Sequence, residues 1–260
     1  MTLFLQAMAP PETSVELLRS RWQELLRRVA EAARRAGRDP AEIRIVAVSK
    51  GHPPELVELA VQAGIRCFGE NYAQEMHRKA NHLRQRGYEV EWHFIGHVQT
   101  NKVKLIAPIA ALIHGVDSQH VAEAFNRWGE RHGVIVPLLL QVNTSGEASK
   151  HGCQPEALFQ LAEAVLRLPS VHLLGLMTIP APAEAQRVRQ EFRLLRNLRG
   201  ELQQRYGSSP EDFPHLSMGM SADYELAVEE GATLLRIGTA LFGERPSKQV
   251  VVTLSHERLP

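Results

Sequence analysis

The chain has 260 residues, of which 44% are hydrophobic and 23% charged. This balance is typical of a globular protein with a sizeable core, and it excludes disordered, collagen-like and coiled-coil chains. The formal charge of +1 provides no overall field that would attract a nucleic acid or an anionic membrane, so neither is expected as a partner.

The first predicted element is a helix over residues 13–37. Thr13 and Glu16 have the spacing of a capping box, apolar residues then recur with a helical period, and Gly37 marks the end. We expect residues 1–12 to form a flexible extension.

From Ile43 onward, short apolar runs alternate with longer segments of mixed charge, which is typical of strand–helix units around a parallel sheet. Strands are predicted at 43–49, 66–69, 91–95, 111–116, 136–143, 171–177, 214–218 and 234–237. Helices are predicted at 54–63, 74–86, 119–132, 155–167, 184–206 and 221–230, with Pro155 and Ser221 in starting positions.

About eight strands, most of them followed by a helix, match the usual size of about 250 residues for a closed barrel. The sequence therefore predicts an α/β protein, a single (β/α)8 TIM barrel with an extra N-terminal helix, in one domain over residues 1–260. An open doubly wound sheet is the alternative. Its G-x-G-x-x-G fingerprint is missing, because residues 50–54 read Lys-Gly-His-Pro-Pro at that turn.

Lys50 directly ends the apolar strand IVAVSK, and active sites of such barrels lie at the carboxyl ends of the strands. A partly desolvated lysine has a lowered pKa, and its free amine adds to carbonyls to make a Schiff base. A lysine that simply leaves the barrel into solvent is equally compatible with this position alone.

A phosphate site is predicted across the barrel from Lys50. Ser217-Met-Gly follows the seventh strand and Gly238-Thr239 follows the eighth, and barrels commonly bind phosphate at these two loops. Tight turns with Ser221 as a helix cap are the structural alternative. A Schiff-base lysine facing a phosphate cup points to pyridoxal 5′-phosphate (PLP) as the cofactor.

Arg236 lies two residues before Gly238 and so shares its inward face of the eighth strand. Because arginine remains protonated, it can only donate to the pyridine nitrogen of PLP, which makes the ring a weak electron sink. Strong carbanion chemistry is therefore disfavoured.

Five strings, in this order along the chain, resemble the signature blocks of the pyridoxal phosphate homeostasis proteins, single-domain relatives of the alanine racemase barrel. They are IVAVSK (45–50), FGENYAQE (68–75), WHFIGHVQTNK (92–102), LSMGMSADYELAVEEGAT (216–233) and RIGTALFG (236–243). The resemblance implies a cofactor site made by Lys50 (Schiff base), Asn71 (near the ring hydroxyl), His93 (lining the barrel), Arg236 (pyridine nitrogen), and Ser217, Gly238 and Thr239 (phosphate).

Family members are thought to carry or regulate PLP, which affects amino-acid and keto-acid pools. Alanine racemase adds a β-domain whose tyrosine is the second catalytic base, and residues 246–260 are too few to make one. We therefore expect a monomeric PLP carrier, not an enzyme, with PLP-dependent apo-enzymes as possible recipients. The alternatives are a weak PLP-dependent amino-acid racemase or lyase, and a Schiff-base aldolase without cofactor.

Three other signals are set aside. His93 and His97 lie where a strand becomes a loop, so a zinc site is not expected, and His97 is placed at the cofactor mouth instead. Six arginines in 187–205 are mixed with glutamates and are interpreted as a solvated helix face. Cys67 and Cys153 form no C-x-x-C pattern, and no signal peptide or membrane span is seen, which favours a cytoplasmic protein.

Overall fold

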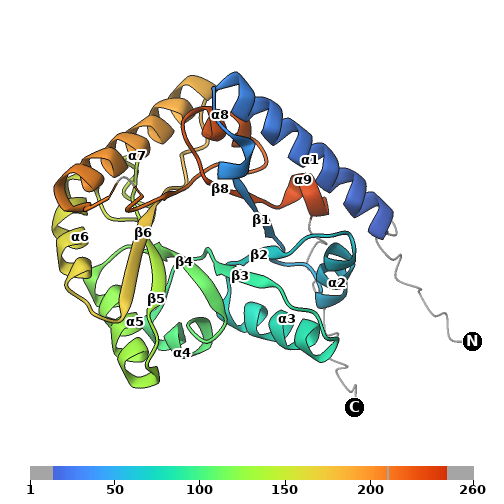
Figure 1. Cartoon of the computed structure of the whole chain (residues 1–260), viewed down its shortest axis with the longest axis horizontal. Helices are drawn as coiled ribbons and strands as arrows, with labels where there is room; N and C mark the ends of the chain where they lie inside the picture. The colour runs from blue at the N-terminus through green and yellow to red at the C-terminus, as the bar shows by residue number, and fades with distance from the viewer. Residues whose placement is uncertain (1–13, 210, 245–260) are drawn as a thin grey trace, which may run out of the picture.

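A computed structural model describes residues 14–209 and 211–244. Eight parallel strands close into a barrel in chain order, and β8 pairs with β1. Helices surround the strands (Figure 1). The predicted (β/α)8 barrel is confirmed, and the open-sheet alternative is wrong because the two edges pair with each other. The strands are β1 (Arg44–Val48), β2 (Cys67–Glu70), β3 (Glu91–Phe94), β4 (Ala110–Val116), β5 (Val136–Gln141), β6 (Val171–Met177), β7 (His215–Ser217) and β8 (Leu234–Ile237).

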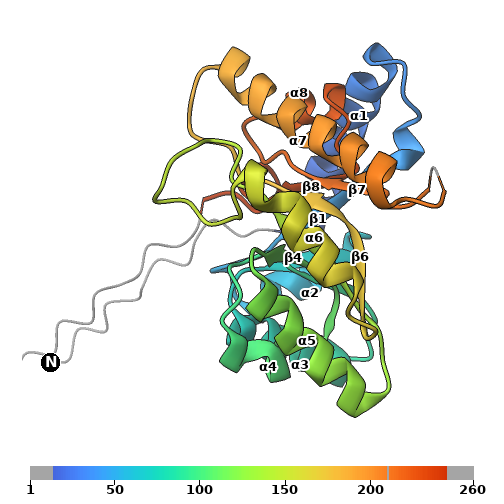
Figure 2. The same ribbon diagram turned by 90° about the vertical axis from the view of Figure 1, so that its left-hand side faces the viewer.

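The helices follow the predicted order with two additions. They are α1 (Val15–Arg35), α2 (Pro54–Gln62), α3 (Ala73–Gln85), α4 (Val103–Ile106), α5 (Gln119–His132), α6 (Leu158–Leu166), α7 (Ala185–Tyr206), α8 (Tyr224–Glu229) and α9 (Thr239–Phe242). The sequence did not predict α4 and α9, because four residues are too few to show a helical period. In Figure 2, α6 lies between α5 and α7 on one flank of the barrel.

The extra N-terminal helix α1 packs beside α8, α9 and α2. Its buried face carries Leu18, Leu25 and Val29, which recur with a helical spacing. The helix cap is Ser14, whose Oγ accepts the amide of Leu17 at 3.2 Å. Thr13 and the extension at residues 1–12 lie outside the described residues.

The barrel interior combines an apolar layer with polar side chains. Leu112, Leu139, Met177 and Leu234 form a buried cluster separate from the large core between strands and helices. Two residues further along β4 and β8, His114 and Arg236 lie on the same face as Leu112 and Leu234. The interior is therefore polar toward the carboxyl ends of these strands.

The arginines of α7 lie on a solvated helix face, as the sequence analysis predicts, and the side chains of Arg187, Arg193 and Arg205 are 57%, 52% and 52% exposed. Glu230, whose side chain is 4% exposed, pairs with Arg189, Arg193 and Arg196. Glu191 is buried and accepts the amide of Ala181 at 3.0 Å. The buried carboxylate of Glu230, which follows α8, therefore pairs with part of this basic run.

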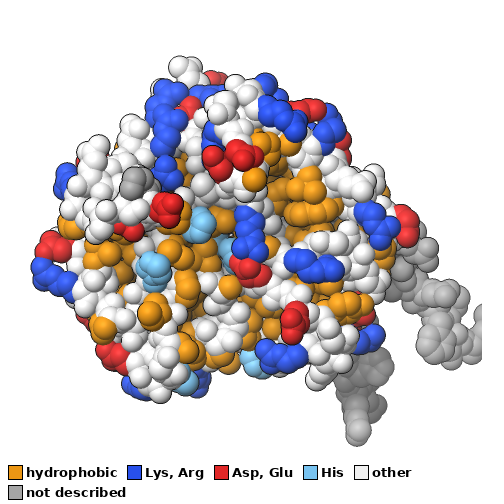
Figure 3. All heavy atoms as spheres, in the orientation of Figure 1, with side chains coloured by type: hydrophobic (Ala, Val, Ile, Leu, Met, Phe, Trp, Pro, Cys, Tyr) orange, Lys and Arg blue, Asp and Glu red, His pale blue; other side chains and the backbone are white. Residues whose placement is uncertain are grey.

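In the space-filling view of the face seen in Figure 1, hydrophobic side chains and histidines gather around the centre, with many charged side chains around them (Figure 3). Among the described helices, none is both long enough and apolar enough to cross a bilayer.

Candidate functional site

Closure of the barrel brings three predicted site segments together. Strand β8 pairs with β1 on one side and with β7 on the other, so the loops after β1, β7 and β8 are neighbours. A Cβ atom added to Gly238 would lie 3.2 Å from the carbonyl oxygen of Val48, which shows how closely the end of β8 approaches β1. Lys50, half-buried, stands in the turn two residues beyond Val48.

A second, fully buried lysine contacts the backbone next to Lys50. The Nζ atom of Lys79, on α3, donates to the carbonyl of Ser49 at 2.6 Å and to the carboxylates of Glu70 at 2.6 Å and Glu75 at 2.8 Å. Glu75 also accepts the amide of Gly51 at 2.7 Å. The residues on both sides of Lys50 are thus fixed to one buried ion-pair network.

Glu70 ends β2 and belongs to the same network. Its Oε1 atom also accepts the hydroxyl of Ser49 at 2.6 Å, while its Oε2 atom is buried with no hydrogen-bond partner among the described residues. Burial raises the pKa of this carboxyl, and the positive charge of Lys79 and the two hydrogen bonds oppose that rise.

Both terminal nitrogens of the Arg236 guanidinium group donate hydrogen bonds. Its Nη1 atom donates to the hydroxyl of Ser217 at 2.6 Å, and Nη2 donates to the carbonyl of Thr178 at 2.8 Å. Burial lowers the pKa of Arg236 to about 10, against the opposing charge of Asp223. The group therefore remains protonated at neutral pH and is a donor only.

A series of hydrogen-bonded side chains leads from Ser217 through the interior of the barrel. The hydroxyl of Ser217 is 2.8 Å from Nδ1 of His114, and Nε2 of His114 is 2.9 Å from Nδ1 of His93. Burial, reinforced by the positive charges nearby, holds the pKa of His114 well below its usual range. The imidazole of His114 thus connects Ser217 to His93 through two hydrogen bonds.

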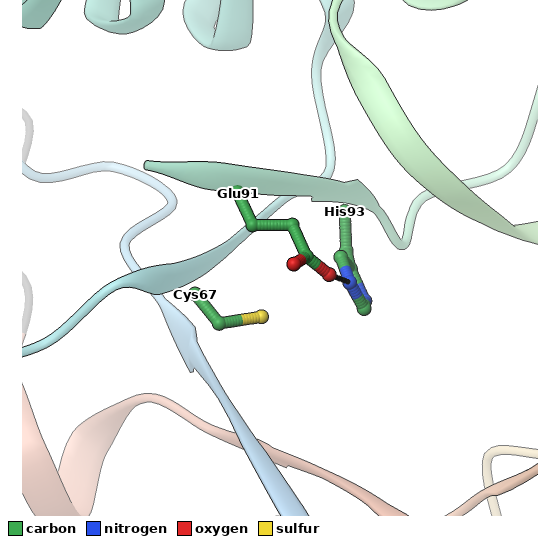
Figure 4. Close-up of side chains that lie close together, drawn as sticks. All are labelled: Cys67, Glu91 and His93. Carbon is green, nitrogen blue, oxygen red and sulfur yellow. Dashed lines mark hydrogen bonds and ion pairs between the residues drawn. The ribbon is translucent and has the colours of Figure 1, made fainter. Parts of the chain in front are cut away.

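The series of hydrogen bonds ends at Glu91, the first residue of β3, whose carboxylate meets the ring of His93 (Figure 4). We call this end of the barrel, where the strands begin, its foot. Nε2 of His93 is 2.7 Å from Oε1 of Glu91, and the Arg44 guanidinium contacts both oxygens of Glu91 at 2.7 and 2.6 Å. The hydrogen bond from His93, helped by those from Arg44, lowers the pKa of Glu91 to about 2. Burial raises the pKa of the neighbouring Cys67 thiol to about 12, so this thiol stays protonated.

The loop after β7 has a fixed shape that depends on glycine. Gly219 has a φ of +93°, and a Cβ atom there would lie 2.5 Å from Cβ of Ala227. Ser221 does not cap α8, contrary to the structural alternative above, because Asp223 is the N-cap residue of this helix. The hydroxyl of Ser221 instead accepts the amide of Ala240 at 3.2 Å and so ties this loop to the loop after β8.

A cavity of about 400 Å³ opens beside β2, β3 and β5. Its lining includes Asn71, Tyr72, His97 and His151, whose imidazole stacks on that of His97 with ring centroids 4.0 Å apart. The Oδ1 atom of Asn71 is buried and has no hydrogen-bond partner among the described residues.

The predicted site residues thus fall into three groups. The first group lies on β8 and on the ends of β1 and β7 beside it. It consists of Lys50, Ser217, Arg236, Gly238 and Thr239. Asn71 lies on the cavity side, beyond β2. His93 and His97 do not share a metal site, because His93 is bonded inside the barrel while His97 lies at the cavity, 3.4 Å from a carboxylate oxygen of Asp117.

Sequence reasoning missed Lys79 and His114, although both left a signal. Lys79 falls on the buried stripe of α3 with Met76, Ala80 and Leu83. His114 interrupts the apolar strand ALIHGV as Lys50 ends IVAVSK. In both cases a polar residue occupies a position where periodicity predicts an apolar one.

A family model, two relatives and a solved structure show which known proteins this chain is similar to. The family model described as "Alanine racemase, N-terminal domain" matches residues 21–246. The pyridoxal phosphate homeostasis protein of Aquifex aeolicus is 44% identical over 86% of this chain and 97% of its own length. That of Pseudomonas aeruginosa is 47% identical over 84% of this chain and 91% of its own. The structure of PipY from Synechococcus elongatus PCC7942 with PLP bound is 34% identical, with a TM-score of 0.75 over 87% of this chain and all of that one.

Proposed function

The chain belongs to the alanine racemase N-terminal domain family and, within it, to the pyridoxal phosphate homeostasis proteins, and on this premise we propose that it binds PLP and maintains the cellular PLP pool. The observation that carries the proposal is the closure of the barrel, which sets the lysine after β1 beside the loops after β7 and β8. When bound, PLP supplies an aldehyde that condenses reversibly with a primary amine.

The residues around β8 fit the charged end of PLP. Gly238 packs on the backbone of β1, where a side chain would meet Val48, and Thr239 is exposed at the mouth. Ser217 ends β7, the strand that pairs with β8, and offers a hydroxyl. These three residues would bind the phosphate through backbone amides and hydroxyls.

The ring end of PLP also finds matching groups. The unpartnered Oδ1 atom of Asn71 is an acceptor that fits the ring hydroxyl. Arg236 would donate to the pyridine nitrogen and keep it unprotonated. Lys50 would form the Schiff base, with the ion pairs of Lys79 holding the turn on which it stands.

These roles suit a carrier more than a catalyst. A pyridine nitrogen that only accepts a hydrogen bond withdraws electrons weakly, so bound PLP would be protected from side reactions with amino acids. We further propose that the protein acts as a cytoplasmic monomer and passes PLP to PLP-dependent apo-enzymes.

Weak amino-acid racemase or lyase activity is the second candidate. It is favoured by Tyr72, which is 65% exposed and lines the same cavity as Asn71, where a phenol could exchange a proton with a substrate. Exchange of the substrate α-proton with deuterated water, lost in Tyr72→Phe, would support this candidate. Wild-type protein that exchanges no proton would exclude it.

The proposal is tested by mixing the purified protein with PLP, recording its visible spectrum, and reducing it with borohydride before peptide mass spectrometry. We expect a Schiff-base absorption band and a single modified residue, Lys50, with both lost in Lys50→Ala. Lys102→Ala is the matched control, because Lys102 is a second lysine close to the proposed ring site and lines the same cavity as Asn71. Modification of Lys102, or of no residue, would overturn the assignment, and an aldolase without cofactor would show no such band.

A further inference from the structure

The side chains inside the barrel form one continuous hydrogen-bonded chain from Arg236 to the foot. It runs through Ser217, His114, His93 and Glu91, and each donor–acceptor distance lies between 2.6 and 2.9 Å. The four members nearest the mouth are at most 4% exposed, whereas the side chain of Glu91 is 31% exposed. The chain therefore connects the proposed phosphate site with solvent on the opposite side of the barrel.

We assign the direction of each hydrogen bond in this chain from its two ends. Arg236 can only donate to Ser217, and we take the single hydroxyl hydrogen of Ser217 to be donated to Nδ1 of His114. A neutral His114 then carries its hydrogen on Nε2 and donates to Nδ1 of His93. His93 in turn donates from Nε2 to the ionised Glu91.

This arrangement conflicts with phosphate binding. With these directions, Ser217 uses its only hydrogen on His114 and has none to give to a phosphate oxygen. If the hydroxyl turns to the phosphate, Nδ1 of His114 faces an oxygen lone pair and must itself carry a hydrogen.

We propose that His114, His93 and Glu91 are positioning residues that couple binding of the phosphate group to the uptake of one proton from solvent. The inference rests on the proposed function, because it takes Ser217 as a phosphate ligand. No redox or covalent step on the ligand is involved.

Binding adds one proton to the three hydrogens that these side chains hold. Before binding, one hydrogen each is held by Ser217 Oγ, His114 Nε2 and His93 Nε2. After binding, Ser217 keeps its hydrogen for the phosphate, His114 carries its hydrogen on Nδ1, and His93 carries hydrogens on both Nδ1 and Nε2. The one added proton enters at the foot, and the resulting imidazolium of His93 lies against the Glu91 carboxylate.

We place this charge on His93 because of the groups that contact its ring. Glu91 touches His93 at 2.7 Å, while His114 has no carboxylate among its hydrogen-bond partners and lies closer to the positive end of the chain. The titratable and charged groups that face the two rings come from five strands, and they are Arg44 (β1), Cys67 (β2), Glu91 (β3), His215 (β7) and Arg236 (β8).

The test uses pyridoxine 5′-phosphate, which has an alcohol in place of the aldehyde and cannot condense with Lys50. Titration calorimetry in buffers of different ionisation enthalpy counts the protons taken up per ligand for wild type and Glu91→Gln. Because protons exchanged by the ligand itself appear in both proteins, the difference between them reports the protein. We expect wild type to take up about one more proton, and its affinity relative to the variant to fall about tenfold per pH unit as the pH rises.

Glu89→Gln is the control, because Glu89 is exposed and lies two residues before Glu91; it should match wild type. Should Glu91→Gln fail to fold, His93→Gln takes its place. Equal proton counts in wild type and variant would overturn the coupling while leaving the phosphate site intact. No binding of the probe by wild type would overturn the phosphate site, and the coupling with it.

Discussion

At the scale of single residues, Lys79 best shows how the site is supported. A fully buried ammonium loses its hydration, and here three oxygens at 2.6–2.8 Å replace it. Two of them belong to carboxylates and the third is the Ser49 carbonyl, one residue before Lys50. The backbone beside the lysine proposed to react is therefore held by a second lysine that is itself fully buried.

We predict that Lys79→Met lowers the free energy of unfolding by about 3–5 kcal/mol, because it leaves Glu70 buried without its counter-charge. PLP binding should weaken as well, since the turn after β1 loses its anchor. Urea unfolding and PLP titration measure the two effects. The double variant Lys79→Met/Glu70→Gln should recover part of the stability, and a single variant that loses less than about 1 kcal/mol would contradict the role of this network.

At the scale of elements, the loop after β7 is the most constrained part of the proposed site. Gly219 has a backbone conformation that favours glycine, and its carbonyl accepts the amide of Arg236 at 2.9 Å. The Ser221 hydroxyl then links this loop to the loop after β8. Both proposed phosphate loops thus depend on one turn.

We predict that Gly219→Ala weakens binding of pyridoxine 5′-phosphate by at least about tenfold, because the new methyl group overlaps Ala227 and displaces the loop. Gly133→Ala is the matched control. Gly133 also has a positive φ, +66°, but it has no heavy atom within 4 Å of the added Cβ and lies after α5. It should cost about 1 kcal/mol of stability and leave the affinity unchanged. Equal affinities for the two variants would show that the turn does not shape the phosphate site.

At the scale of the whole molecule, the foot of the barrel holds distant strands together. The ion pair between Arg44 and Glu91 joins β1 to β3 across β2, and Glu91 also anchors His93 inside the barrel. The folded state therefore favours the ionised form of Glu91.

We predict that this contribution is lost in acid. Because the folded pKa of Glu91 is about 2 and its ordinary value is 4.5, the stabilisation is complete above pH 4.5 and disappears as the pH falls toward 2. Wild type should therefore exceed Glu91→Gln in stability at pH 7, by a margin that narrows between pH 4.5 and 2 in urea unfolding. Glu89→Gln should follow wild type throughout. A margin independent of pH would refute the prediction.

The sequence by itself determined the barrel, the order of its strands and the positions of Lys50, Ser217 and Arg236 at the carboxyl ends of strands. These follow from local information, because the alternation of apolar runs and the residue that ends each run can be read within about ten positions. The roles of those residues toward PLP remain predictions.

Only the tertiary structure decided what these residues touch. His114 and Ser217 are 103 positions apart yet share a hydrogen bond, Ser221 bonds to the next loop instead of capping its own helix, and Lys79 reaches the backbone beside Lys50. Such pairs form because the sheet closes on itself and forces buried polar groups to find partners across the interior. Periodicity shows which side of a strand is buried, but the partner of a buried polar group depends on the closure of the whole barrel.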